Sequence, residues 1–83
     1  MNNSIKIRAV YDNGGKTFDR YSVYLDEPFN DKFLHCLGLP SNPDSPQGFS
    51  QFSSGMLGKH NGKKISFNDL PENVRNHVAR RLS

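Results

Sequence analysis

The sequence predicts a small α+β domain, and three patterns along the chain support that prediction. Alternating apolar and polar residues near the N-terminus indicate β-strands, and an apolar stripe near the C-terminus indicates a helix. Between them lies a long stretch rich in glycine and proline, which is typical of a loop. With 83 residues, the chain has room for one domain with a small core. We therefore expect a single domain over residues 1–83, with a C-terminal helix packed on a small antiparallel sheet.

An N-terminal β-hairpin is the first predicted element. Residues 5–11 read IKIRAVY, the period-two pattern of a half-buried strand. Residues 18–25 form a second β-rich run with large apolar residues on one face. The intervening residues 12–17, DNGGKT, tolerate positive φ where a tight reversal needs it. Pro28 ends the second strand, since proline cannot extend a ladder of hydrogen bonds.

A short helix is predicted next, over residues 29–37, because the apolar residues of this segment share one helical face. Gly38 and Pro40 follow it, as is usual after a helix. Residues 38–64 then hold five of the seven glycines and three of the five prolines. Connections are mostly about 4–6 residues long, and large apolar side chains argue against disorder. We expect a long ordered loop that faces a ligand, with a short strand over residues 63–67 as a further candidate.

The C-terminal helix has a clear start signal and a clear stripe. Ser66 is followed three residues later by Asp69, and then by Pro71, which together mark a helix start. A helix over residues 69–82 should dock its apolar stripe on the hairpin. The stripe recurs at every fourth position, at Leu70, Val74, Val78 and Leu82.

The charge of the chain is unevenly distributed. The net charge is +3, yet residues 1–58 carry five Lys/Arg against six Asp/Glu, whereas residues 59–83 carry six against two. A basic C-terminal third can attract the phosphates of a nucleotide or nucleic acid, or an acidic protein. The alternative is a solvated cationic helix face, formed by Arg75, Arg80 and Arg81, which lie off the apolar stripe.

Composition limits the class of protein. Only 34% of the residues are hydrophobic and the mean hydropathy is −0.73, so the monomer is either modestly stable or gains buried surface by forming a homo-oligomer. No apolar run approaches the roughly 18 residues of a membrane span, and residues 1–10 lack the apolar region of a signal peptide. The single cysteine, Cys36, excludes an internal disulfide framework and fits a reducing cytosol. A buried thiol is favoured over a reactive nucleophile, given its leucine neighbours.

The chain offers no pattern for catalysis or metal binding. The histidines and Cys36 are scattered, the serines lie outside any GxSxG motif, and no spacing suggests paired carboxylates. We therefore expect a protein that is not an enzyme and that holds no metal or cofactor. The glycine-rich turn at residues 12–17 resembles an anion-binding nest, but it lacks the spacing of a phosphate loop. A structural turn is the favoured interpretation.

A more credible binding site combines aromatic, amide and cationic residues within the long loop. Aromatic rings can stack on a nucleobase, glutamines can hydrogen-bond its edge and lysines can neutralise phosphates. Gly58 and Gly62 would let backbone amides approach such a ligand. In the alternative interpretation, the phenylalanines fold inward and anchor the loop. The candidate ligand-binding residues are Gln47, Phe49, Gln51, Phe52, Lys59, His60, Lys63 and Lys64.

Three stretches resemble a family of small proteins encoded by bacteriophages and prophages: AVYDNGGKTFDRYSV, SNPDSPQGFSQ and LGKHNGKKISFNDLPENV. The resemblance implies a phage accessory protein in the cytoplasm of a bacterial host. The expected function is that of a binding protein that modulates or inhibits a host bacterial system, such as a defence system. It would do so by binding a phosphate-bearing ligand, either a signalling nucleotide or nucleic acid. A protein inhibitor of a host effector that handles nucleic acid is the alternative, and a small hydrolase is disfavoured. The partners would be a host bacterial protein or a nucleotide or nucleic-acid ligand.

Overall fold

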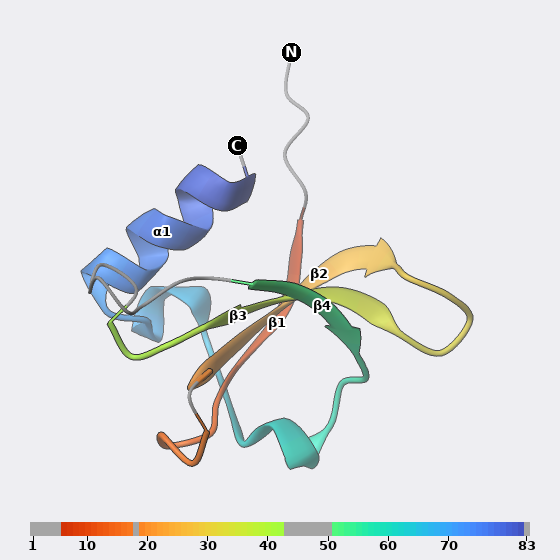
Figure 1. Ribbon diagram of the computed structural model, residues 1–83, viewed down its shortest axis with the longest axis horizontal. Helices are drawn as coiled ribbons and strands as arrows, with labels where there is room; N and C mark the ends of the chain where they lie inside the picture. The colour runs from red at the N-terminus through yellow and green to blue at the C-terminus, as the bar shows by residue number, and fades with distance from the viewer. Residues whose placement is uncertain (1–5, 18, 43–50, 83) are drawn as a thin grey trace.

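The computed structural model describes residues 6–17, 19–42 and 51–82 as a five-stranded antiparallel sheet with a C-terminal helix (Figure 1). The strands lie in the order β4-β3-β2-β1-β5, so β4 and β5 are the two edges. This arrangement is a small α+β fold, as the sequence predicts. The elements are β1 (Ile7–Asp12), β2 (Tyr21–Pro28), β3 (Leu34–Leu39), β4 (Gln51–Gly55), η1 (Lys59–Asn61), β5 (Lys63–Ile65), η2 (Phe67–Asp69) and α1 (Glu72–Leu82).

Strands β1 and β2 pair antiparallel, with Val10 opposite Val23 and Asp12 opposite Tyr21. The glycine-rich turn joins them, and its end is closed by a hydrogen bond from the Asn13 amide to the Arg20 carbonyl (3.0 Å). The second strand begins at Tyr21, later than the predicted residue 18, which lies outside the described residues. Alternate residues of both strands therefore point to opposite faces of the sheet.

The predicted helix over residues 29–37 is wrong, because β3 occupies the second half of that segment. Leu37 and Leu39 point to one face of the sheet while Leu34 and Cys36 point to the other, where a second apolar cluster lies. A strand that is covered on both faces loses the alternation of apolar and polar residues, so its sequence can be mistaken for a helical face. Gly38 does not end a helix but lies inside β3, opposite Ser22.

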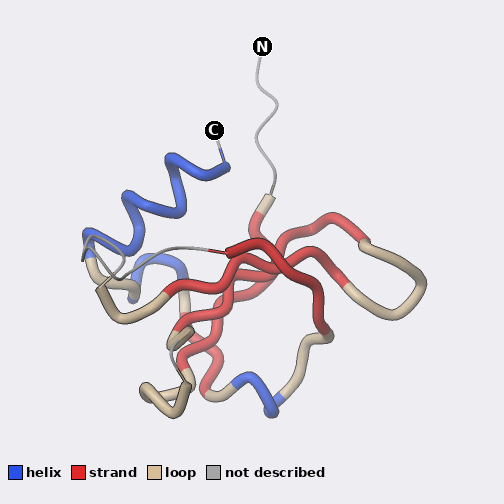
Figure 2. The backbone as a smooth tube through the Cα atoms, in the orientation of Figure 1, coloured by secondary structure: helices blue, strands red, loops and turns tan. Residues whose placement is uncertain are grey.

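The prediction of one long loop over residues 38–64 is also wrong (Figure 2). Strands β3 and β4 pair antiparallel, with Leu37 opposite Phe52 and His35 opposite Ser54. Strand β5 begins within the same stretch and matches the start of the strand predicted at residues 63–67. The β4 sequence, QFSSG, is too short and too polar to show strand periodicity, because an edge strand needs only partial burial. Residues 43–50 of the predicted loop lie outside the described residues.

Helix α1 covers one face of the sheet, which we call the helix face (Figure 1). The predicted capping box is present: the Asn68 amide donates to Ser66 Oγ (3.2 Å) and the Ser66 amide to Asp69 Oδ2 (2.9 Å). It caps η2, however, so α1 begins at Glu72 rather than at residue 69. The predicted stripe packs against the sheet core as expected, with Leu70, Val74 and Val78 buried and Leu82 half-buried.

The opposite face, which we call the tyrosine face, carries a second buried cluster of Ala9, Tyr11, Tyr24 and Cys36. Residues 56–62, here called the crossing segment, run from β4 at one edge to β5 at the other. Leu57 of this segment packs on the cluster. Both faces of the sheet are therefore covered, one by a helix and the other by a short irregular segment.

Candidate functional site

The residues predicted to bind a ligand do not form one site. Phe52 lies on β4, whereas Lys63 and Lys64 lie on β5, at the opposite edge of the sheet with three strands between them. Lys59 and His60 are exposed on η1, beside β5. Gln51 begins β4, whereas Gln47 and Phe49 lie outside the described residues. The predicted site is thus divided into an aromatic part at β4 and a basic part at β5.

The crossing segment is held by its own hydrogen bonds. The Tyr24 hydroxyl donates to Asn61 Oδ1 (2.8 Å), and the Gly58 amide donates to the Tyr11 hydroxyl (3.2 Å). The Gly62 amide donates to the Lys59 carbonyl (3.0 Å). The two glycine amides that we expect to approach a ligand therefore have partners within the fold.

The turn at residues 12–17 is also held by its own hydrogen bonds, as a structural turn is. The Gly14 amide donates to Asp12 Oδ1 (2.8 Å), and the amides of Gly15 and Lys16 donate to Asn13 Oδ1 (2.8 and 3.1 Å). Arg20 forms two hydrogen bonds to the Asp12 carboxylate, at 2.8 and 3.2 Å. The Arg20 hydrogen bond holds the pKa of Asp12 below its usual value. The amides of an anion nest are thus already occupied by side-chain oxygens.

Two ionisable groups on the tyrosine face are held in their neutral forms. Burial raises the pKa of the Cys36 thiol to about 11 and that of the Tyr24 phenol to about 12. A thiol with so high a pKa holds little of the nucleophilic thiolate at neutral pH. Cys36 is therefore a packing residue in this fold.

These two groups predict a loss of stability in alkali. In the unfolded chain the thiol ionises near pH 9 and the phenol near pH 10, so the unfolded state loses both protons first. The free energy of unfolding should then fall as the pH rises from about 9 to about 12. Urea unfolding at a series of pH values would measure this fall, and Cys36→Ala should flatten its lower part. A midpoint that stays constant over this range would contradict the prediction.

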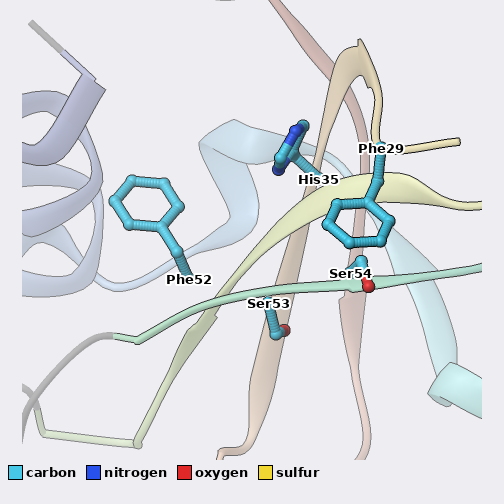
Figure 3. Close-up of a pocket in the computed structure, with 5 residues that line it drawn as sticks. All are labelled: Phe29, His35, Phe52, Ser53 and Ser54. Atoms are coloured by element: carbon cyan, nitrogen blue, oxygen red, sulfur yellow. The ribbon is translucent and has the colours of Figure 1, made fainter.

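Two of the exposed phenylalanines, Phe29 and Phe52, lie near β4 instead (Figure 3). An open depression of about 500 Å³ is lined by Phe29, His35, Phe52, Ser53 and Ser54, and we call it the aromatic depression. Figure 3 shows the His35 ring between those of Phe52, on the side of α1, and Phe29. The side chains of Phe29 and Phe52 remain 55% and 45% exposed, which is unusual for residues of this size.

A cationic group borders this depression. The guanidinium carbon of Arg81 lies 4.8 Å from the centre of the Phe52 ring, within the range of a cation–π contact. The Phe29 and His35 rings meet edge to face at 5.4 Å, and His35 Nε2 lies 3.7 Å from Glu27 Oε1. The structure thus brings together Phe52 and Arg81 of the predicted sets, which lie far apart in the sequence.

The other two predicted arginines have different surroundings. Arg75 donates to the Asn68 carbonyl (3.2 Å) at the start of the helix. Arg80 lies 3.4 Å from the ring nitrogen of His77. Phe29 and His35 also line the depression, but they fall within the predicted helix and are not among the predicted site residues. Two phenylalanines lie within five residues of Pro28, in a polar turn. This pattern is a signal for an exposed aromatic surface.

The structure supplies few alternatives for a site of another kind. Within residues 6–17, 19–42 and 51–82, no three metal-ligating side chains come together. In the same part of the chain, no helix has the length and apolar character needed to cross a membrane. Comparison with known proteins identifies no relative, since no family model, no curated protein and no solved structure matches the chain.

Proposed function

We propose that the protein is a non-enzymatic binding protein whose ligand carries a nucleobase and a phosphate, and that this ligand binds in the aromatic depression. One observation supports this most directly: the exposed ring of Phe52 lies against the guanidinium of Arg81. Stacking of a base on an aromatic ring contributes about 1–3 kcal/mol to binding, whichever base it is. An arginine beside the ring adds cation–π attraction to the base and pairs with its phosphate.

The shape of the depression and the groups that line it favour this class of ligand. Two exposed phenylalanines offer apolar area, while the Ser54 hydroxyl and the His35 ring supply hydrogen-bonding groups beside them. The depression is open and lies along a strand edge, so it has room for a base whose sugar–phosphate backbone continues along the edge. Arg81, in the last turn of α1, provides positive charge beside Phe52.

The resemblance of the sequence to phage-encoded proteins supplies a biological setting for the proposal. A phage-encoded accessory protein in the cytoplasm of a bacterial host could act against host defence by sequestering a signalling nucleotide or by covering nucleic acid. Both ligands present a nucleobase and a phosphate, so the same residues would recognise either one. Titration with both kinds of ligand would distinguish these two possibilities.

Titration with single-stranded oligonucleotides, mononucleotides and cyclic dinucleotides tests this function. We expect binding, and we expect Phe52→Ala to weaken it about tenfold or more, as the loss of one stacked base would. Phe33→Ala is the matched control, because Phe33 is also an exposed phenylalanine but does not line the depression. Binding of oligonucleotides alone would identify nucleic acid as the ligand. Absence of binding across the panel, or equal effects of both variants, would contradict the proposal.

A second function, inhibition of a host protein that handles nucleic acid, is supported by the exposed apolar side chains. Phe29, Phe33, Phe52 and Met56 are all exposed, and such residues are enriched where proteins meet. A stoichiometric host protein that stays bound after nuclease treatment and is released by Phe29→Ser with Phe33→Ser would favour this function. Loss of the partner on nuclease treatment would favour the nucleic-acid function instead.

A further inference from the structure

The two edges of the sheet are protected very differently. Strand β5 has three residues, and two of them are the lysines Lys63 and Lys64. Strand β4 has five residues, Gln51–Gly55, with neither a charge nor a proline among them. An edge strand has a row of backbone N–H and C=O groups without ladder partners, and lysines are a common means of blocking it. The β5 edge is therefore blocked against strand pairing, whereas no strand among the described residues pairs with the outer side of β4.

We propose that two copies of this chain pair through their β4 edges across a two-fold axis, forming one continuous ten-stranded antiparallel sheet. Two-fold dimers are the commonest closed assemblies, and they require a surface that complements itself. Pairing β4 with itself brings no like charges together, since the strand has none. The occupant of this edge is thus a second copy, and the proposal does not depend on the ligand suggested above.

The side-chain faces restrict the register of this pairing. Phe52 lies opposite Leu37 on the helix face, whereas Ser53 lies opposite Cys36 on the tyrosine face. A two-fold axis perpendicular to the sheet keeps each residue on its own face, so Phe52 can lie opposite Ser54 or another Phe52 but not opposite Ser53. Overlap of all five residues places Ser53 on the axis and Phe52 opposite Ser54.

This register gives the exposed Phe52 ring a partner. With Phe52 opposite Ser54, the two Phe52 residues become diagonal neighbours, about 7–8 Å apart and within reach of aromatic contact. The residue on the axis, Ser53, is small, so the two backbones can approach to the usual strand spacing of about 4.8 Å. The Phe52 ring of each copy then has an aromatic neighbour from the other copy.

Charges near β4 are arranged so that they complement each other across the axis. Arg81 lies over Phe52, at the Gln51 end of the strand. Glu27 lies beside His35, which is opposite Ser54 at the other end. An antiparallel two-fold brings the arginine end of one copy to the glutamate end of the other. Opposite charges placed in this way favour the correct register and oppose a parallel arrangement.

The pairing would also change the aromatic depression. In each copy Phe52, Ser54 and His35 belong to the helix face, and the axis keeps the two helix faces on the same side of the joined sheet. The two depressions then meet at the axis and form one groove, with helix α1 of each copy on either side. Such a groove could accommodate an extended ligand that one copy holds at only one point.

Sedimentation equilibrium of the full chain tests the pairing. We expect a mass twice the 9.4 kDa of one chain, and we expect Ser53→Lys to reduce it to the monomer, because two lysines would meet at the axis. Lys64→Ser on β5 is the matched control and should leave the mass unchanged. Circular dichroism would verify that each variant is folded. A wild-type protein that is monomeric at the highest attainable concentration would overturn the proposal, as would a Ser53→Lys dimer.

Two proline variants make the test independent of charge. Adjacent N–H groups of a strand point to opposite sides, so only one of Ser53→Pro and Ser54→Pro removes an N–H that bonds to β3. The variant that remains as stable as the wild type should be monomeric, and a dimer would overturn the pairing. If the wild type is monomeric and its β4 edge pairs with a strand of another protein, the proposal that a second copy occupies this edge is wrong. Nucleotide binding by a monomeric wild type would overturn the pairing and leave the proposed function intact.

Discussion

Replacing Gly62 with alanine is expected to lower the free energy of unfolding by about 3 kcal/mol or more. Gly62 has a φ of +103°, a conformation that residues with a Cβ atom rarely adopt. An added Cβ would lie 2.5 Å from the Asp12 carbonyl oxygen and 2.6 Å from Asn13 Cα. Both are backbone atoms, so they cannot move aside as the end of a side chain could. The cost therefore combines conformational strain with overpacking.

Gly15→Ala provides the matched control for this prediction. Gly15 also has a positive φ, +87°, but an added Cβ would meet nothing within 4 Å. Only the conformational cost remains, which is about 1–2 kcal/mol. Urea unfolding followed by circular dichroism would measure both variants. Equal losses would mean that the contact between Gly62 and the turn does not constrain the fold as the structure indicates.

Replacing Leu37 with alanine is expected to lower the free energy of unfolding by about 2–5 kcal/mol, the usual range for a buried leucine. Leu37 is fully buried on the helix face and belongs to the same cluster as Val23 and Val74. Removing its side chain would leave a cavity between β3 and α1. Urea unfolding under the same conditions would measure the loss.

Two further leucines test the strand assignment of β3. Leu39 is fully buried in the cluster of Leu37, so Leu39→Ala should have a similar effect. Leu34 is only partly buried, on the tyrosine face, so Leu34→Ala should have a smaller one. In a helix over residues 29–37, Leu34 and Leu37 would instead share a face. A Leu34→Ala variant as unstable as Leu37→Ala would therefore contradict the strand.

The elements whose apolar residues repeat with a clear local period were the ones that the sequence could predict. The alternation through Val10 gives β1, and the stripe of Leu70, Val74 and Val78 gives the face of α1 that packs on the sheet. The sequence of β3 shows no such period, because its apolar residues pack on both faces, towards α1 on one side and in the cluster with Tyr24 on the other. Local periodicity contains no information about a cover supplied by a distant segment.

The candidate site was harder to predict for a related reason. Phe52 and His35 come together only because β4 pairs with β3, and Arg81 joins them only because α1 packs on the same face. The lysines of β5 separated from Phe52 because the chain crosses the whole sheet between them. Residue types at short spacing suggested one site, whereas strand order placed them at opposite edges.

The position of β5 also bears on how the chain folds. Strands β1, β2 and β3 pair with their neighbours in sequence, so each pairing closes a short loop. Strand β5 pairs with β1, and Val10 and Ile65 are more than fifty residues apart in the sequence. Closing so long a loop loses conformational entropy before the contacts between β1 and β5 can offset that loss. We infer that the three-stranded meander forms early and that the closing pair, with the crossing segment over the tyrosine face, is a late event.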